Sequence, residues 1–140
     1  MRPPEEAVIR KIVGEWIRKA DQDTAYAQAL RSQDPPLLYP SCFHSQQAAE
    51  KYLKAYLPWR QVEFPKTHSI REILNLVKTV DEELATDLLP AAALTPYGVE
   101  VRSPSNIPDP TRPETEEALS LAKKVCGAVA RRLKETRRAE

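Results

Sequence analysis

The feature that most constrains the fold is one long apolar stripe near the start of the chain. Between Pro4 and about Ser32, apolar residues recur at spacings of three and four, or multiples of these: Ile9, Val13, Trp16, Ala20, Ala27 and Leu30. This spacing places them on one face of a helix. The sequence therefore predicts a single long helix over this stretch.

One charged residue, Asp23, falls on the same stripe between Ala20 and Ala27. Burying an unpaired carboxylate costs roughly several kcal/mol, so Asp23 must be paired or solvated. Three interpretations stay open from the sequence. The stripe opens to solvent at this point, Asp23 caps a neighbouring backbone amide, or Asp23 joins polar residues of another helix.

Proline residues set the expected bounds of the second helix. Prolines 35, 36 and 40 cannot continue the first helix, and Ser41 is a suitable N-cap for the next one. The second helix is expected to end near Leu57, before Pro58. Its core-facing line is Ala49, Tyr52, Leu53, Tyr56 and Leu57, and a second, polar line is His44, Gln47, Lys51 and Lys54.

The remaining chain predicts shorter helices and one long helix. Thr67 or Ser69 is expected to cap a helix that starts at Ile70, and a further helix opens at residues 81–83. Prolines 90 and 96 interrupt that stretch, after which a helix is expected to resume. A proline-rich loop over residues 103–113 precedes a last helix that starts near Pro113. We expect one all-α domain over residues 1–140, an up-and-down antiparallel bundle of four to five helices.

Composition excludes several classes of function. With three glycines, the chain has no P-loop or Rossmann fingerprint, and its net charge of +1 does not favour a general nucleic-acid binder. No Cys or His spacing suggests a metal site, and no cofactor is expected. Neither a signal peptide nor an apolar run of about 18 residues is present, so we expect a cytoplasmic chain with no membrane span. The basic segment 131–138 is either a solvated helix end or a tail that binds RNA or a partner.

The segment "FHSQQAAEKYLKAYL", residues 43–57, resembles the second helix of the HEPN domain, which typically has the pattern F-H-x-Q-Q-A-A-E-K-x-L-K-A. Three further segments are similar to that family in the same order. They are "EWIRKADQD", "PKTHSI" and "LTPYGVEVRSP", with Trp16, Ala20, Asp23, Pro65, Thr67, His68, Leu94, Tyr97, Arg102 and Pro104 at the matching positions.

The resemblance implies a homodimer whose frequent partner is a minimal nucleotidyltransferase, in a pair like a toxin and its antitoxin, with a nucleotide as the ligand. Some branches of the family are metal-independent ribonucleases, in which an Arg is followed after four to six residues by His. Here no His follows Arg102, and Ser103 replaces the usual Tyr. We therefore expect a non-catalytic interaction module. The alternative is a ribonuclease with a diverged site.

The candidate site consists of Asp23, His44, Gln47, Lys51 and Arg102. In an enzyme, His44 would act as base or acid, Arg102 would stabilise phosphorane charge, and Asp23 would orient His44. In a structural network, the same residues would pair within the chain, with Asp23 or Glu50 as the partners of Lys51 and Lys54. For His68, a local capping or loop contact is expected rather than catalysis.

Overall fold

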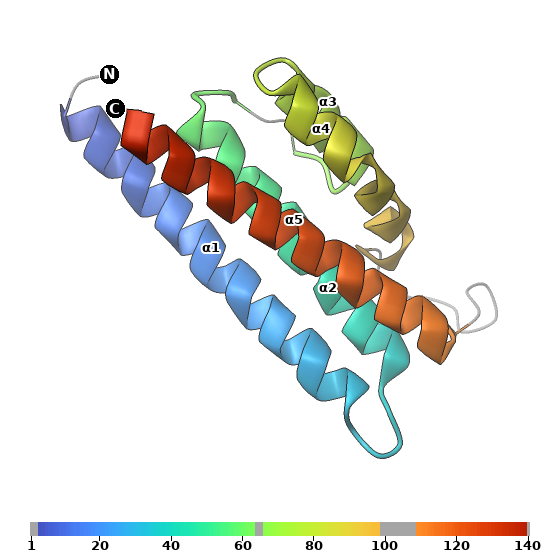
Figure 1. Ribbon diagram of the computed structural model, residues 1–140. Coiled ribbons are helices and arrows are strands. Elements are labelled where there is room, and N and C mark those ends of the chain that lie inside the picture. The colour runs from blue at the N-terminus through green and yellow to red at the C-terminus, as the bar shows by residue number, and fades with distance from the viewer. Residues whose placement is uncertain (1–2, 64–65, 99–108, 140) are drawn as a thin grey trace.

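The computed structural model describes residues 3–63, 66–98 and 109–139, and in these ranges the chain forms helices and no strand (Figure 1). The predicted all-α fold is confirmed. The elements are α1 (Pro3–Arg31), α2 (Leu38–Trp59), α3 (Ile70–Lys78), α4 (Glu82–Leu88), the 3-10 helix η1 (Leu89–Gly98) and α5 (Arg112–Ala139). The three long helices lie side by side, and the shorter elements flank them.

Helix α2 is the centre of the bundle, because it packs against α1, α5, α3 and η1. All five residues of its predicted core-facing line are at most 6% exposed. Helix α1 runs antiparallel to both α2 and α5, so the first and last helices bring the two chain ends to the same end of the bundle (Figure 1). At the opposite end, Arg31 and Glu116 form an ion pair of 3.0 Å between α1 and α5.

Both predicted bounds of α2 are wrong by a few residues, because proline is tolerated in terminal turns. Helix α2 begins at Leu38, and Pro40 lies in its first turn, where a missing N–H removes no helical hydrogen bond. Ser41 is therefore inside the helix and is not its cap. The Ser41 hydroxyl donates to the carbonyl of Ala27 at 2.8 Å and so ties the start of α2 to α1. At the other end, the helix continues through Pro58 to Trp59.

The predicted caps of the shorter helices are largely confirmed. Ser69 caps α3 by accepting a hydrogen bond from the N–H of Glu72. Thr67, the other candidate, instead accepts from the N–H of Ser69 at 3.1 Å. Asp81 caps α4 through the N–H of Leu84. The sequence thus located these turns correctly from the positions of short oxygen-bearing side chains.

The chain after α4 forms a 3-10 helix rather than the expected continuation of regular helix. η1 covers Leu89–Gly98 and contains Pro96. Prolines 90 and 96 lack the N–H donors that an α-helical ladder needs, so a tighter helix is a natural outcome. The expected loop lies mostly outside the described residues. Helix α5 starts at Arg112, one residue before the predicted Pro113.

Candidate functional site

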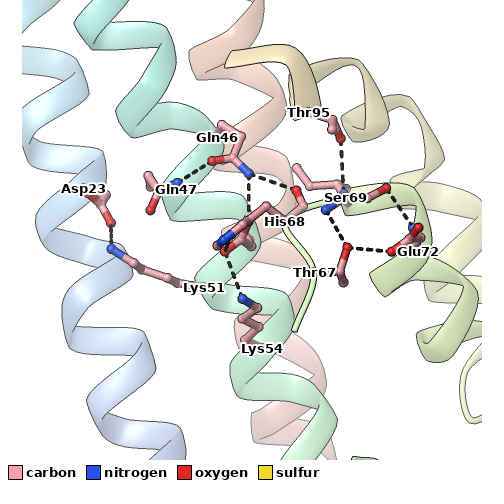
Figure 2. Close-up of polar contacts among 12 residues, drawn as sticks. Asp23, Gln46, Gln47, Lys51, Lys54, Thr67, His68, Ser69, Glu72 and Thr95 are labelled. Carbon is pink, nitrogen blue, oxygen red and sulfur yellow. Dashed lines mark hydrogen bonds and ion pairs between the residues drawn. The ribbon is translucent and has the colours of Figure 1, made fainter. Parts of the chain in front are cut away.

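Asp23 of α1 is buried and paired with two residues of α2. Its side chain is 7% exposed, His44 Nδ1 lies 2.7 Å from Oδ1, and Lys51 Nζ lies 2.5 Å from Oδ2. His44 and Lys51 are seven residues apart, about two helical turns, so both project from one face of α2. Figure 2 shows Lys51 reaching from α2 to Asp23 of α1. We call these three residues the Asp23 centre. The solvated and amide-capping interpretations of Asp23 are thereby excluded.

The Asp23 centre borders the surface. The side chains of His44 and Lys51 are 27% and 22% exposed. The imidazole ring lies 5.1 Å from the Tyr26 ring and 5.3 Å from the Phe43 ring. Because Nδ1 faces the carboxylate, the imidazole is held in one orientation with Nε2 on its other side, as in a general base positioned by a carboxylate.

A second carboxylate, Glu50, has three nitrogen donors around it. Its side chain is 4% exposed and accepts from Gln46 Nε2 at 3.0 Å and Lys54 Nζ at 3.0 Å. His68 Nδ1 lies 3.1 Å from Oε1. Lys54 is itself buried and lies 5.8 Å from the ring centroid of Trp16. We call Glu50, Gln46, Lys54 and His68 the Glu50 centre. The predicted pairing of Lys54 with Glu50 is confirmed.

His68 makes a contact that the sequence did not predict. A local contact was expected, but the imidazole faces Glu50 of α2, 18 residues earlier, while 78% of its side chain stays exposed. Gln46 Nε2 also approaches the carbonyl of His68 at 3.5 Å (Figure 2). These contacts hold the segment before α3 against α2. The spacing of four residues on either side of Glu50 was the available signal for Gln46 and Lys54, whereas no sequence signal indicated His68.

Gln47 links the two centres. Its Nε2 donates to Gln46 Oε1 at 2.6 Å, as Figure 2 shows, so the polar contacts reach from one turn of α2 to the next. Gly98 at the end of η1 completes the enclosure of Gln46, because a Cβ at that position would lie 2.6 Å from its Cδ. A larger residue at position 98 would therefore collide with this amide.

Arg102, the remaining predicted site residue, lies outside the described residues. Its convergence with His44 stays a prediction. In the described ranges, no group of three His, Cys, Asp or Glu side chains could hold a metal ion. None of the helices described there is both long and apolar enough to cross a membrane.

A third carboxylate, Asp81, stands apart from the candidate site and joins α2, α4 and α5. It accepts from Tyr56 Oη at 2.7 Å, Arg132 Nε at 2.9 Å and the N–H of Leu84 at 3.0 Å. Burial by itself would raise the pKa of Asp81, but these hydrogen bonds and the Arg132 charge hold it below its usual value. Burial and the bond to Asp81 together raise the pKa of Tyr56 to about 12.

Comparison with known proteins agrees with this geometry. The HEPN domain family matches residues 13–133. The crystal structure of TT1696 from Thermus thermophilus is 32% identical, with a TM-score of 0.66 over 85% of this chain and 96% of that one. The crystal structure of ST0689, an archaeal HEPN homologue, is 25% identical, with a TM-score of 0.67 over 86% and 96% of the two chains. No curated protein matches. With its helical order and most of its length matched, the chain belongs to the HEPN domain family.

Proposed function

We propose that this protein is a non-catalytic, homodimeric HEPN interaction module that works with a minimal nucleotidyltransferase. The carrying observation is that the charges of the candidate site are neutralised within the chain. Lys51 pairs with Asp23, and Lys54 pairs with Glu50. Metal-independent RNA cleavage needs a cation free to meet a developing phosphorane charge, and both lysines are engaged elsewhere.

An exposed apolar edge on α1 supports the homodimer. Val8, Ile12 and Tyr26 are 57%, 39% and 55% exposed. They are 4 and 14 residues apart, and these spacings return to nearly the same side of a helix. Tyr26 also packs on His44, so the edge continues into the Asp23 centre. A second copy of the chain is the proposed cover for this edge.

Sedimentation velocity at micromolar concentration tests the homodimer. The wild-type chain should sediment as a dimer, and Ile12→Glu or Tyr26→Glu should give monomers that keep their helical circular dichroism. Leu89→Glu is the matched control, because Leu89 is 45% exposed but lies on η1. A wild-type monomer, or dissociation by Leu89→Glu alone, would contradict the proposal.

The nucleotidyltransferase partner and a nucleotide ligand are supported by family membership and not by a contact in this chain. The proposed partner is a minimal nucleotidyltransferase encoded beside this protein, in a toxin–antitoxin-like pair. Co-expression followed by gel filtration tests the pair, and growth of cells expressing each protein alone and together tests the toxin–antitoxin relation. Separate elution of the two proteins would remove the partner from the proposal. Titration calorimetry with ATP tests the nucleotide.

A metal-independent ribonuclease is the second candidate, and one observation favours it. The 2.7 Å contact between Asp23 and a partly exposed His44 is the arrangement of an oriented general base. The test is RNA cleavage in EDTA by the wild type, His44→Ala and Arg102→Ala, with His68→Ala as the control histidine. The interaction module predicts no cleavage. Cleavage lost in the first two variants and retained in the control would establish the ribonuclease instead.

A further inference from the structure

A pocket of about 260 Å³ lies between α1, α2 and α5, near the end of the bundle where the chain termini lie (Figure 1). Its apolar wall includes Val13 and Ile17 of α1, Tyr52 of α2, and Ala130 and Leu133 of α5. The pocket uses a different side of α1 from the Val8–Ile12–Tyr26 edge. Neither the Asp23 centre nor the Glu50 centre contributes to it, so its occupant is independent of the function proposed above.

Gly14 keeps this pocket open without a packing reason inside the described chain. A Cβ built at Gly14 has no atom within 4 Å, although the residue lies in the interior of α1. Glycine in a helix interior costs about 1 kcal/mol relative to alanine. A larger side chain at this position would fit the helix and would fill the pocket.

The polar groups that line the pocket are hydrogen-bond donors. Arg10 and Lys134 are cationic, and no acidic side chain is among the lining residues. The indole Nε1 of Trp59 is buried and has no hydrogen-bond partner among the described residues. The hydroxyl of Tyr52 already donates to Asp21 at 2.8 Å. Such a lining is complementary to a ligand with acceptor oxygens and negative charge.

We propose that this pocket binds a small amphipathic carboxylate, such as a medium-chain acyl or aromatic acid. The apolar body would contact Val13, Ile17 and Leu133, and the carboxylate would meet Arg10 and Lys134. A pocket of 260 Å³ lies just below the range of roughly 300–1,000 Å³ that is typical for drug-sized ligands, which favours a small molecule over a packed helix of a partner.

Trp59 in the pocket wall provides the readout. In a Trp16→Phe background it is the sole tryptophan, and sodium decanoate, kept below its micelle concentration, should change its fluorescence saturably. Gly14→Leu should weaken decanoate binding by at least about tenfold while the thermal midpoint is kept or raised. Ala130→Leu provides a second filling variant. Gly127→Leu is the matched control, because Gly127 also has open space around a Cβ but does not line the pocket.

The role of the charge is tested with 1-decanol and with Arg10→Gln and Lys134→Gln. Decanoate should bind more tightly than decanol, and the two variants together should remove most of this preference. Three results would each overturn the proposal: no saturable signal at millimolar decanoate, equal binding by Gly14→Leu and the wild type, or decanol binding as tightly as decanoate.

Discussion

The Asp23 centre and the Glu50 centre have the same composition and nearly the same burial, but they differ in what surrounds the carboxylate. Each carboxylate side chain is almost fully buried, at 7% and 4% exposed, and each is paired with one lysine and one histidine. At Asp23 both partners are half-buried. At Glu50 the lysine is 9% exposed, whereas the histidine is 78% exposed.

This difference separates a stabilising role from an accessible one. A buried cation that loses its counter-ion is left uncompensated, which is far more costly than the pair itself was favourable. Lys54 is in that position, because it lies under Trp16 and beside Glu50. Lys51 and His44 retain contact with solvent and can rehydrate. The two centres should therefore respond very differently to loss of the carboxylate.

The largest effect is expected for Glu50→Ala. It leaves Lys54 buried without a counter-ion and removes an acceptor from Gln46, so the free energy of unfolding should fall by about 3–5 kcal/mol. Urea unfolding followed by circular dichroism measures this change. The double variant Glu50→Gln/Lys54→Met removes both charges and should recover most of the loss. A cost below about 1 kcal/mol for Glu50→Ala would end the distinction between the centres.

A smaller loss is expected for Asp23→Asn. The introduced amide can still accept one hydrogen bond, and both partners can turn toward water, so the free energy of unfolding should fall by about 1.5–3 kcal/mol. The control is Asp87→Asn, an exposed carboxylate of α4, which should change stability by no more than about 0.5 kcal/mol. A larger loss for Asp23→Asn than for Glu50→Ala would reverse the assignment of roles.

Asp81 offers a third carboxylate without a histidine, and its effect depends on pH. Its folded-state pKa lies below its usual value, so its contribution is complete above the unfolded pKa of about 3.9 and is lost as pH falls through the folded pKa. Asp81→Asn should cost about 1–2 kcal/mol at pH 7, and the gap to wild type should close in acid. Urea unfolding from pH 7 to pH 3 measures the gap. A gap that grows in acid would contradict this sign.

The sequence predicted the helices and one half of the polar network well, for a physical reason. The apolar spacing of α1 and the oxygen-bearing caps of α3 and α4 are local signals, and local signals survive folding unchanged. Glu50 and Lys54 were likewise one helical turn apart. Prolines 40 and 58 were misjudged because a terminal turn tolerates what an interior turn does not.

The long-range contacts needed the fold itself. Asp23 was recognised as a residue that had to be paired or solvated, but its joining of His44 and Lys51 depends on how α1 lies on α2. His68 and Gly98 reach the Glu50 centre from segments far along the chain, and no spacing within α2 pointed to them. The functional role of the candidate site residues, and the place of Arg102, stay predictions.

The smallest effect is expected for His68→Ala, although His68 touches a carboxylate as buried as Asp23. An exposed ion pair contributes about 0–1 kcal/mol, and the imidazole is 78% exposed, so the urea midpoint should barely move. Its contact instead holds the segment before α3 on α2. Trypsin should therefore cut more quickly after the exposed Lys66 in the variant than in wild type. His44→Ala is the matched control, since it should lower stability more and leave this cleavage unchanged. Unaltered cleavage in His68→Ala would mean that Ser69 and Thr67 hold the segment alone.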